Sequence, residues 1–144
     1  MTRMVDDVLS QGHRRELVSS PEWNSVCAMR HNVVFEGPER ETDGLLQLLE
    51  PHLHTPAVWK RAPMPLELPT DGCGTLVVQE VSALDRHEQA ALLKWLGGSS
   101  DRRQVVSTTV LPLFPLLARG LFDETLYYRL NVVLLSVDST GASV

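Results

Sequence analysis

Apolar and polar positions divide the chain into two kinds of segment. Four segments are nearly continuous apolar runs: "NVVFEG" (32–37), "TLVVQEV" (75–81), "RQVVSTTV" (103–110) and "LNVVLLSV" (130–137). Runs of this kind are typical of short strands that are buried on both faces of a parallel sheet. A fifth segment, "TPAVWKRA" (55–62), predicts a further strand. The prolines that follow it predict a loop before the next strand.

Four other segments have helical patterns. They span about 21–30, 42–53, 86–98 and 113–120. The first begins with Ser20-Pro21-Glu22, where serine caps the helix, proline suits the first position and the acid favours the first turn. Pro51 should end or kink the second helix. Asp85 followed by Glu88 predicts a capping box at the start of the third.

Strands and helices therefore alternate through most of the chain. This alternation predicts an α/β layered fold with a mostly parallel sheet. The 144 residues fit one domain with one core. We expect an N-terminal helical segment over 1–31, the α/β domain over 32–137 and a tail over 138–144.

Three residues at predicted strand ends are the first candidates for a binding site. Gly37, Glu80 and Thr109 each stand at or next to the end of an apolar run. Parallel α/β sheets bind their ligands at the carboxyl ends of the strands. We therefore expect these three residues to line one crevice.

Charge and composition exclude several classes of function. The net charge of −5 argues against direct DNA binding, because phosphate contacts need a basic face. No apolar run approaches the ~20 residues of a membrane span, and the first residues lack the apolar core of a secretory signal, so we expect a cytoplasmic protein. Cys27 and Cys73 are expected to be reduced, although two cysteines would permit a disulfide. His52, His54 and Cys73 match no ligand spacing, so we expect no metal site.

Three longer stretches carry a family resemblance. They are "GTLVVQEVSALDRHEQAALLKWL", "RQVVSTTV" and "ARGLFDETLYYRLNVVLL". Together they resemble the AAA+ domain of sigma-54-dependent transcriptional activators, over about residues 32–137. The resemblance implies a three-layer P-loop NTPase-like α/β fold. It also implies an ATPase that works in a ring of subunits and uses a surface loop to remodel the polymerase that holds sigma-54.

The segment in the place of the family's phosphate loop departs from the family pattern. The loop is a glycine-rich turn with a lysine before the helix, and the matching stretch is "GPERETDG" (37–44). Only Gly37 matches, since Arg40 and Thr42 stand where further glycines belong and Asp43 replaces the lysine. One charge pair at ~4 Å and an effective dielectric of ~20 is worth roughly 4 kcal/mol, so the reversed sign opposes a phosphate. Arg40 could stand in for the lysine in part, but it comes three positions early.

The other chemical positions of the family are also altered. Gln79 replaces the magnesium acid, and an amide brings no charge to the metal. Glu80 keeps the position that in the family polarises the attacking water. Val110 replaces a sensor asparagine. Of two arginine-finger positions, one holds Asp123 and the other keeps Arg129, which is either a finger or an interface residue.

The sequence also shows no pattern for whole parts of the family's domain. The chain has no string like the family's sigma-54 contact loop, which argues against a sigma-54 contact, and we expect neither the helical lid subdomain nor a DNA-reading helix-turn-helix. We therefore predict a degenerate, non-hydrolysing module that regulates transcription or signalling by binding a protein partner or itself, without a cofactor. The alternative is a nucleotide-binding or weak ATPase domain of a sigma-54-dependent regulator. That alternative would use ATP and magnesium with Glu80, Arg129 and Arg40.

Overall fold

We describe the protein from a computed structural model, which describes residues 16–63, 65, 67–69, 73–97 and 103–137. The predicted tail over 138–144 and most of the predicted N-terminal segment lie outside these residues. Helices and strands follow in the order α3 (Pro21–Ala28), β1 (Val33–Glu36), α4 (Glu39–Leu49), β2 (Ala57–Arg61), β3 (Thr75–Gln79), α5 (Arg86–Gly97), β4 (Gln104–Thr109), α6 (Leu113–Ala118), α7 (Glu124–Leu130) and β5 (Val133–Ser136). Short 3₁₀ turns cover Glu50–His52 and Val81–Ala83.

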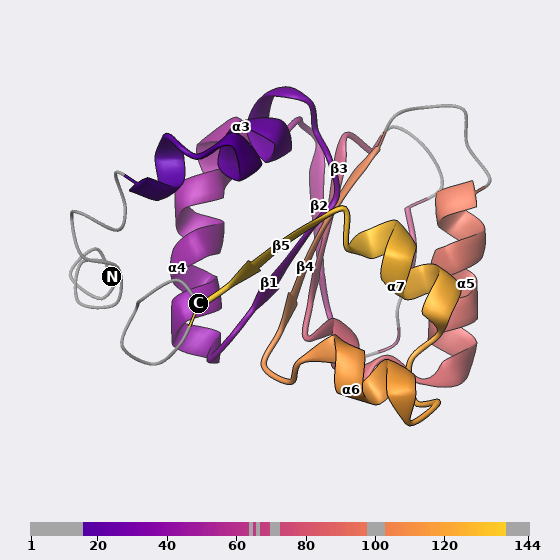
Figure 1. The fold of residues 1–144 in the computed structure, drawn as a ribbon. Helices are drawn as coiled ribbons and strands as arrows, with labels where there is room; N and C mark the ends of the chain where they lie inside the picture. The colour runs from indigo at the N-terminus through magenta and orange to yellow at the C-terminus, as the bar shows by residue number, and fades with distance from the viewer. Residues whose placement is uncertain (1–15, 64, 66, 70–72, 98–102, 138–144) are drawn as a thin grey trace.

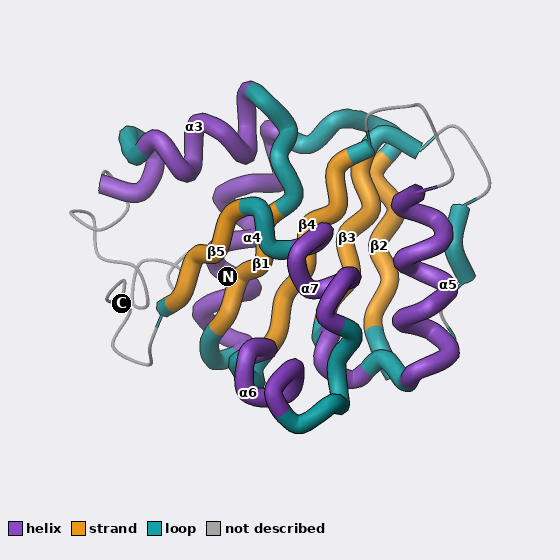
Figure 2. The backbone as a smooth tube through the Cα atoms, turned by 45° about the vertical axis from the view of Figure 1, so that its right-hand side comes forward, coloured by secondary structure: helices purple, strands orange, loops and turns teal. Residues whose placement is uncertain are grey.

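The five strands form one sheet in the order β2-β3-β4-β1-β5, and every neighbouring pair is parallel. Figure 2 shows the strands side by side in this order. Because they run in the same direction, all of their carboxyl ends lie along one edge of the sheet. Glu36 at the end of β1, for example, is level with Thr109 of β4 and Ser136 of β5.

Helices cover both faces of the sheet and complete three layers. Figure 1 shows α3 and α4 on one side and α5, α6 and α7 on the other. Alternate strand residues supply the two cores, so Val33 and Phe35 pack with the α3–α4 layer while Val34 packs with the other layer. The predicted three-layer, parallel α/β fold is therefore confirmed. Within the described residues there is no helical lid subdomain, and no helix is long and apolar enough to span a membrane.

The predicted capping signals are confirmed at two helix starts. The Ser20 hydroxyl oxygen accepts a hydrogen bond from the Trp23 amide at 3.1 Å, at the start of α3. At α5 the Asp85 carboxylate accepts from the Glu88 amide at 2.8 Å, and the Glu88 carboxylate accepts from the Asp85 amide at 3.1 Å. These bonds satisfy amides that the first helical turn leaves without intrahelical partners.

Several element boundaries differ from the predictions, and three of the differences are the most informative. The strand predicted over 75–81 ends at Gln79, because Glu80 takes a left-handed conformation and turns the chain into a 3₁₀ turn. The helix predicted from residue 42 begins at Glu39. The strand predicted over 130–137 begins only at Val133, because Leu130 ends helix α7, which the sequence prediction omitted.

Candidate functional site

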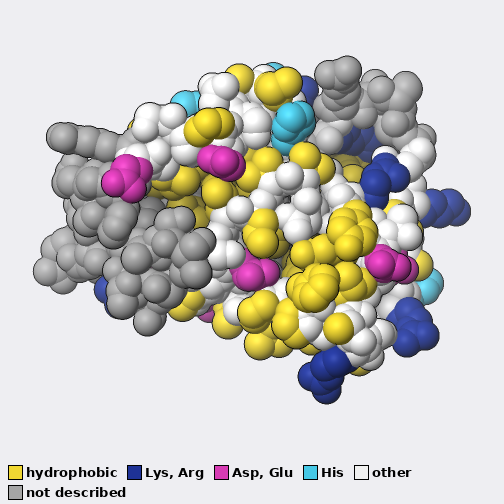
Figure 3. Space-filling model, viewed as in Figure 1, with side chains coloured by type: hydrophobic (Ala, Val, Ile, Leu, Met, Phe, Trp, Pro, Cys, Tyr) yellow, Lys and Arg dark blue, Asp and Glu magenta, His cyan; other side chains and the backbone are white. Residues whose placement is uncertain are grey.

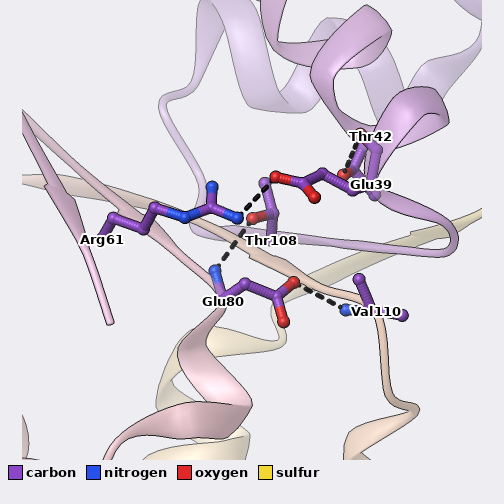
Figure 4. A network of polar contacts seen from close by, with 6 residues as sticks. All are labelled: Glu39, Thr42, Arg61, Glu80, Thr108 and Val110. Atoms are coloured by element: carbon purple, nitrogen blue, oxygen red, sulfur yellow. Dashed lines mark hydrogen bonds and ion pairs between the residues drawn. The ribbon is translucent and has the colours of Figure 1, made fainter. Parts of the chain in front are cut away.

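The structure brings the three predicted strand-end residues together at the carboxyl edge of the sheet. The Gly37 amide donates a hydrogen bond to the Thr109 carbonyl at 3.0 Å, which joins the ends of β1 and β4. The Glu80 amide donates to the Thr108 hydroxyl at 3.2 Å, which joins the end of β3 to β4. Figure 4 shows the polar contacts at this edge.

The connection from β1 to α4 is too short to be a phosphate loop. Only Gly37 and Pro38 lie between the end of β1 at Glu36 and the start of α4 at Glu39. In a phosphate loop, four residues and a second glycine separate the first glycine from the lysine, and the helix follows. Here the helix occupies that interval: it begins at Glu39, three residues before the predicted start at Thr42, and no loop spans 37–44.

The predicted phosphate-loop residues are therefore helical. Arg40, Thr42 and Asp43 all lie in α4, with Asp43 already the fifth residue of the helix. The Thr42 amide donates to the Pro38 carbonyl at 3.0 Å, and the Thr42 hydroxyl donates to the Glu39 carbonyl at 3.1 Å. Thr42 is buried with both groups used inside its own helix.

Gly37 has a structural reason to be glycine. Its φ of 153° is a backbone conformation that residues with a side chain rarely adopt. A Cβ at this position would lie 2.3 Å from the Val137 carbonyl oxygen and 2.9 Å from Val137 Cγ2. Val137 is held there because its amide donates to the Glu36 carbonyl at 2.9 Å. The close approach of these two backbone segments therefore requires glycine without any ligand.

Carboxylates dominate the charge around the start of α4. Glu39 and Glu41 lie in its first turn, where the positive end of the helix dipole favours negative side chains. Glu39 forms an ion pair with Arg61 at the end of β2, but both side chains are about half exposed, so the pair stabilises the fold little. Burial raises the pKa of the Asp43 carboxyl, the Glu39 carboxylate raises it further, and Arg61 lowers it in part. Figure 4 shows Arg61 directed at Glu39.

Glu80 holds two strand ends together. It has φ 57° and ψ 53°, a left-handed conformation that costs a non-glycine residue about 1–2 kcal/mol. Its carboxylate oxygen accepts a hydrogen bond from the Val110 amide at 3.0 Å, just after β4 ends. The neighbouring Gln79 ends β3 level with Arg61 of β2, and its carbonyl accepts from the Ala62 amide at 3.0 Å.

The two arginine-finger positions lie in α7 or at its start. Asp123 caps this helix, because its carboxylate accepts from the Leu126 amide at 2.8 Å. Arg129 lies in the last turn and donates to the Leu96 carbonyl at 3.1 Å. The Arg129 carbonyl accepts from the side chain of Asn32, which directly precedes β1. Arg129 therefore lies toward the amino-terminal edge of the sheet, and the structure does not bring it together with Glu80 at the opposite edge.

The cysteines and histidines form no site in the described residues. Cys27 and Cys73 are both free thiols, so the disulfide alternative is not realised. No cluster of three or more His, Cys, Asp or Glu side chains suited to a metal occurs in the part of the chain that the structure describes. His52 and His54 lie in and just after the 3₁₀ turn that follows α4.

Sequence reasoning missed Glu39 and Arg61 as parts of this edge. The signal for Arg61 was present, since it stands at the end of the second predicted strand and parallel strands end at one edge. Glu39 could not be placed, because the expected loop put it in a turn rather than at the start of a helix.

Comparison with known proteins identifies the family. The model of the sigma-54 interaction domain matches residues 49–139. The chain belongs to this family. The match begins at the last residue of α4, so it runs from there through β5 and leaves out the β1–α4 connection.

One curated relative matches part of the chain, and solved structures share its fold. The HTH-type transcriptional regulatory protein TyrR of Salmonella typhimurium is 33% identical over a match that covers 44% of this chain and 15% of TyrR, so the match spans only a small part of that relative. NtrX from Brucella abortus, solved in complex with ADP, superposes with a TM-score of 0.60 at 20% identity, over 83% of this chain and 37% of NtrX. The RuvB A156S mutant of Thermotoga maritima gives a TM-score of 0.62 at 17% identity, over 90% of this chain and 46% of RuvB. At these identities the structures show a shared fold and no more.

Proposed function

We propose that this sigma-54 interaction domain does not hydrolyse ATP and regulates transcription by contacting proteins. The observation that carries the proposal is the two-residue connection between β1 and α4. A triphosphate is normally held by successive loop amides in front of a helix, and here the helix begins before such a loop could form. The family match over residues 49–139 supports retention of the family's fold.

Electrostatics supports the same proposal. A magnesium triphosphate would have to approach the exposed Glu39 in the first turn of α4, with Asp43 one turn further on, although Arg40 is also exposed in that first turn. Gln79 offers a neutral amide to the metal in place of a carboxylate. The residues present therefore do not fit the group that the family uses, and we derive no reaction step through it.

The contacts of Glu80 give it a role that needs no catalysis. A general base must reach a water next to a held phosphate, and Glu80 instead uses one carboxylate oxygen on the Val110 amide. We propose that it was retained as a link between the ends of β3 and β4. A protein that acts by contact needs this edge ordered, not reactive.

The alternative is a nucleotide-binding or weakly hydrolysing domain of a sigma-54-dependent regulator. It is favoured by one observation, namely that Glu80 lies at the carboxyl edge of the sheet, where such folds bind ligands. Under this alternative Arg129 would serve the nucleotide of a neighbouring subunit. We also propose that the protein acts in the cytoplasm without touching DNA directly, which its net charge of −5 supports.

Phosphate release and association together test the proposal. The chain should release no phosphate from ATP with magnesium above the rate of a Glu80→Gln control. It should associate with itself or with an intact sigma-54-activator ATPase domain in size-exclusion chromatography with light scattering. Phosphate release that Glu80→Gln abolishes would establish the alternative. A strict monomer that binds neither itself nor the intact domain would contradict action by protein contact.

A further inference from the structure

A groove lies on the face of the molecule opposite α3 and α4. It measures about 830 Å³ and is bounded by α5, α6, α7 and the segment between α6 and α7. We call it the α5–α7 groove. Its lining includes the apolar side chains of Leu93, Leu117 and Phe122. Figure 3 shows hydrophobic side chains gathered over α6 and α7, with charged side chains at the margin.

Exposed apolar side chains mark this groove as a contact surface. Phe114 is 59% exposed, Leu121 is 54% exposed and Tyr128 is 59% exposed, and all three line the groove. Clustered large apolar side chains rimmed by charge are typical of protein interaction sites. Phe114 and Tyr128 both stand near the buried Tyr127 ring, with ring centroids 6.3 Å and 5.1 Å away, so the exposed aromatics stand on a packed base.

The two long walls of the groove run side by side in the same direction. At one end, the Gln89 side chain of α5 accepts from the Asp123 amide at 2.8 Å, where α7 begins. At the other end, Arg129 of α7 donates to the Leu96 carbonyl of α5 at 3.1 Å. Lys94 follows Gln89 by the same number of positions as Tyr128 follows Asp123, so Lys94 and Tyr128 stand at the same level on opposite walls.

Charges of opposite sign stand at the beginning of the two walls. Arg86 is the first residue of α5, Glu124 is the first residue of α7, and both line the groove. Both side chains are exposed, and neither forms an ion pair with another described residue. Among the residues that the structure describes, one wall therefore begins with a cation and the other with an anion that have no ion-pair partner.

This arrangement is self-complementary about one axis. A two-fold axis along the groove lays α5 of one copy over α7 of the other, because both walls run in the same direction. Lys94 then meets the Tyr128 ring twice, which is a favourable cation–π pairing. Arg86 faces the start of the opposite α7 about one helical turn from Glu124, a distance of about 6 Å that its long side chain can span, and this contact also occurs twice. A two-fold axis across the groove would instead lay α5 on α5 and bring Lys94 to Arg86, which repel. Charge therefore selects the first arrangement.

We propose that the α5–α7 groove binds a second copy of this chain in a two-fold symmetric dimer, with Phe114, Leu121 and Tyr128 buried at the interface. The inference rests on the proposed function, since it names the partner of a module that acts by protein contact. It also differs from a head-to-tail ring, in which two different faces would meet.

Sedimentation of the full chain tests whether the groove is the interface. We expect a concentration-dependent dimer. Phe114→Ser should raise its dissociation constant by at least about tenfold, because aromatic anchors carry most of the binding energy of an interface. Met29→Ser is the matched control, since Met29 is 62% exposed and lies at the end of α3 in the other layer. A strict monomer, or a dimer that Phe114→Ser leaves unchanged, would overturn the inference.

A charge-swap mixture tests the symmetry. Arg86→Glu alone and Glu124→Lys alone should each weaken the dimer, because each places like charges across both contacts. An equal mixture of the two variants should recover dimerisation, because the two substituted side chains then face each other at one contact and native Glu124 faces native Arg86 at the other. Circular dichroism confirms that both variants are folded. A folded mixture without recovery overturns the inference, as does a monomer that binds only an intact sigma-54-activator domain, although that last result would leave the proposed function standing.

Discussion

Replacing Gly37 with alanine should destabilise the protein more than the same change at Gly120 or Gly97, even when no nucleotide is present. The new Cβ would lie 2.3 Å from the Val137 carbonyl oxygen, well inside any normal contact. Val137 cannot withdraw freely, because its amide is bonded to the Glu36 carbonyl at 2.9 Å. Either β5 shifts away from β1 or the β1–α4 connection moves.

The cost can be estimated from two contributions. Forcing an extra methyl group into a packed site costs about 1–3 kcal/mol. Holding alanine in an unfavourable backbone conformation costs about 1–3 kcal/mol more. The sum, roughly 2–6 kcal/mol, is a large part of the 5–15 kcal/mol that stabilises a typical domain.

Two other glycines separate the two contributions. Gly120 has φ 73° but open space around its Cβ position, so Gly120→Ala should cost only the conformational part, about 1–2 kcal/mol. Gly97 is helical with open space, so Gly97→Ala should be neutral or stabilise by about 0.5–1 kcal/mol.

Urea unfolding of the three variants, monitored by circular dichroism, measures the order of their stability losses directly. If Gly37→Ala costs no more than Gly120→Ala, the close approach of Val137 does not constrain this position. The retained glycine would then need another explanation, and a phosphate would again be a candidate.

Three further predictions concern the edge of the sheet. The double variant Asp43→Lys with Gln79→Asp should restore the family's charges at these two positions. It should still gain no ATP affinity in calorimetry, because α4 still begins at Glu39. A gain in affinity would show that charge alone had removed binding. Glu80→Gln keeps an acceptor for the Val110 amide and should change the free energy of unfolding little. Glu80→Ala removes the acceptor and should cost about 1 kcal/mol in urea unfolding. Equal effects of the two variants would contradict the role of the Glu80 side chain as an acceptor. Asp43→Asn should stabilise the fold at neutral pH, because burial and Glu39 disfavour the ionised Asp43 carboxylate. The gain should be only a few tenths of a kcal/mol, because the partly exposed carboxyl is screened by solvent. Since the folded-state pKa of Asp43 lies above its ordinary 3.8, the wild type loses stability relative to the variant as the pH rises through that window, so the gain should vanish below about pH 3.8; a gain that persists there would contradict this cause.

Much of the fold could be predicted because local signals and global packing agree. The apolar runs of β3 and β4 and the caps Ser20 and Asp85 specify their elements without distant information. The sequence prediction passed from the helix over 113–120 directly to the strand over 130–137, and so omitted helix α7. Its signal was Asp123, which caps the helix through the Leu126 amide.

The candidate site was less predictable, because its geometry depends on one junction. The sequence shows which residues replace the family's chemical groups, and Gly37 and Glu80 do lie at one edge of the sheet. It does not show that the helix begins at Glu39, because Pro38 fits both a loop and the position before a helix. The left-handed backbone of Glu80 is also not encoded by its residue type, since tertiary contacts to Thr108 and Val110 maintain it.

The most direct test is a calorimetric titration of the full chain with ATP and magnesium. Because a helix stands where the phosphate loop should be, and acids lie in the first turns of that helix, ATP up to about 1 mM should give no saturable heat. Saturable binding with a micromolar dissociation constant, lost in the variant Gln79→Ala, would contradict the account.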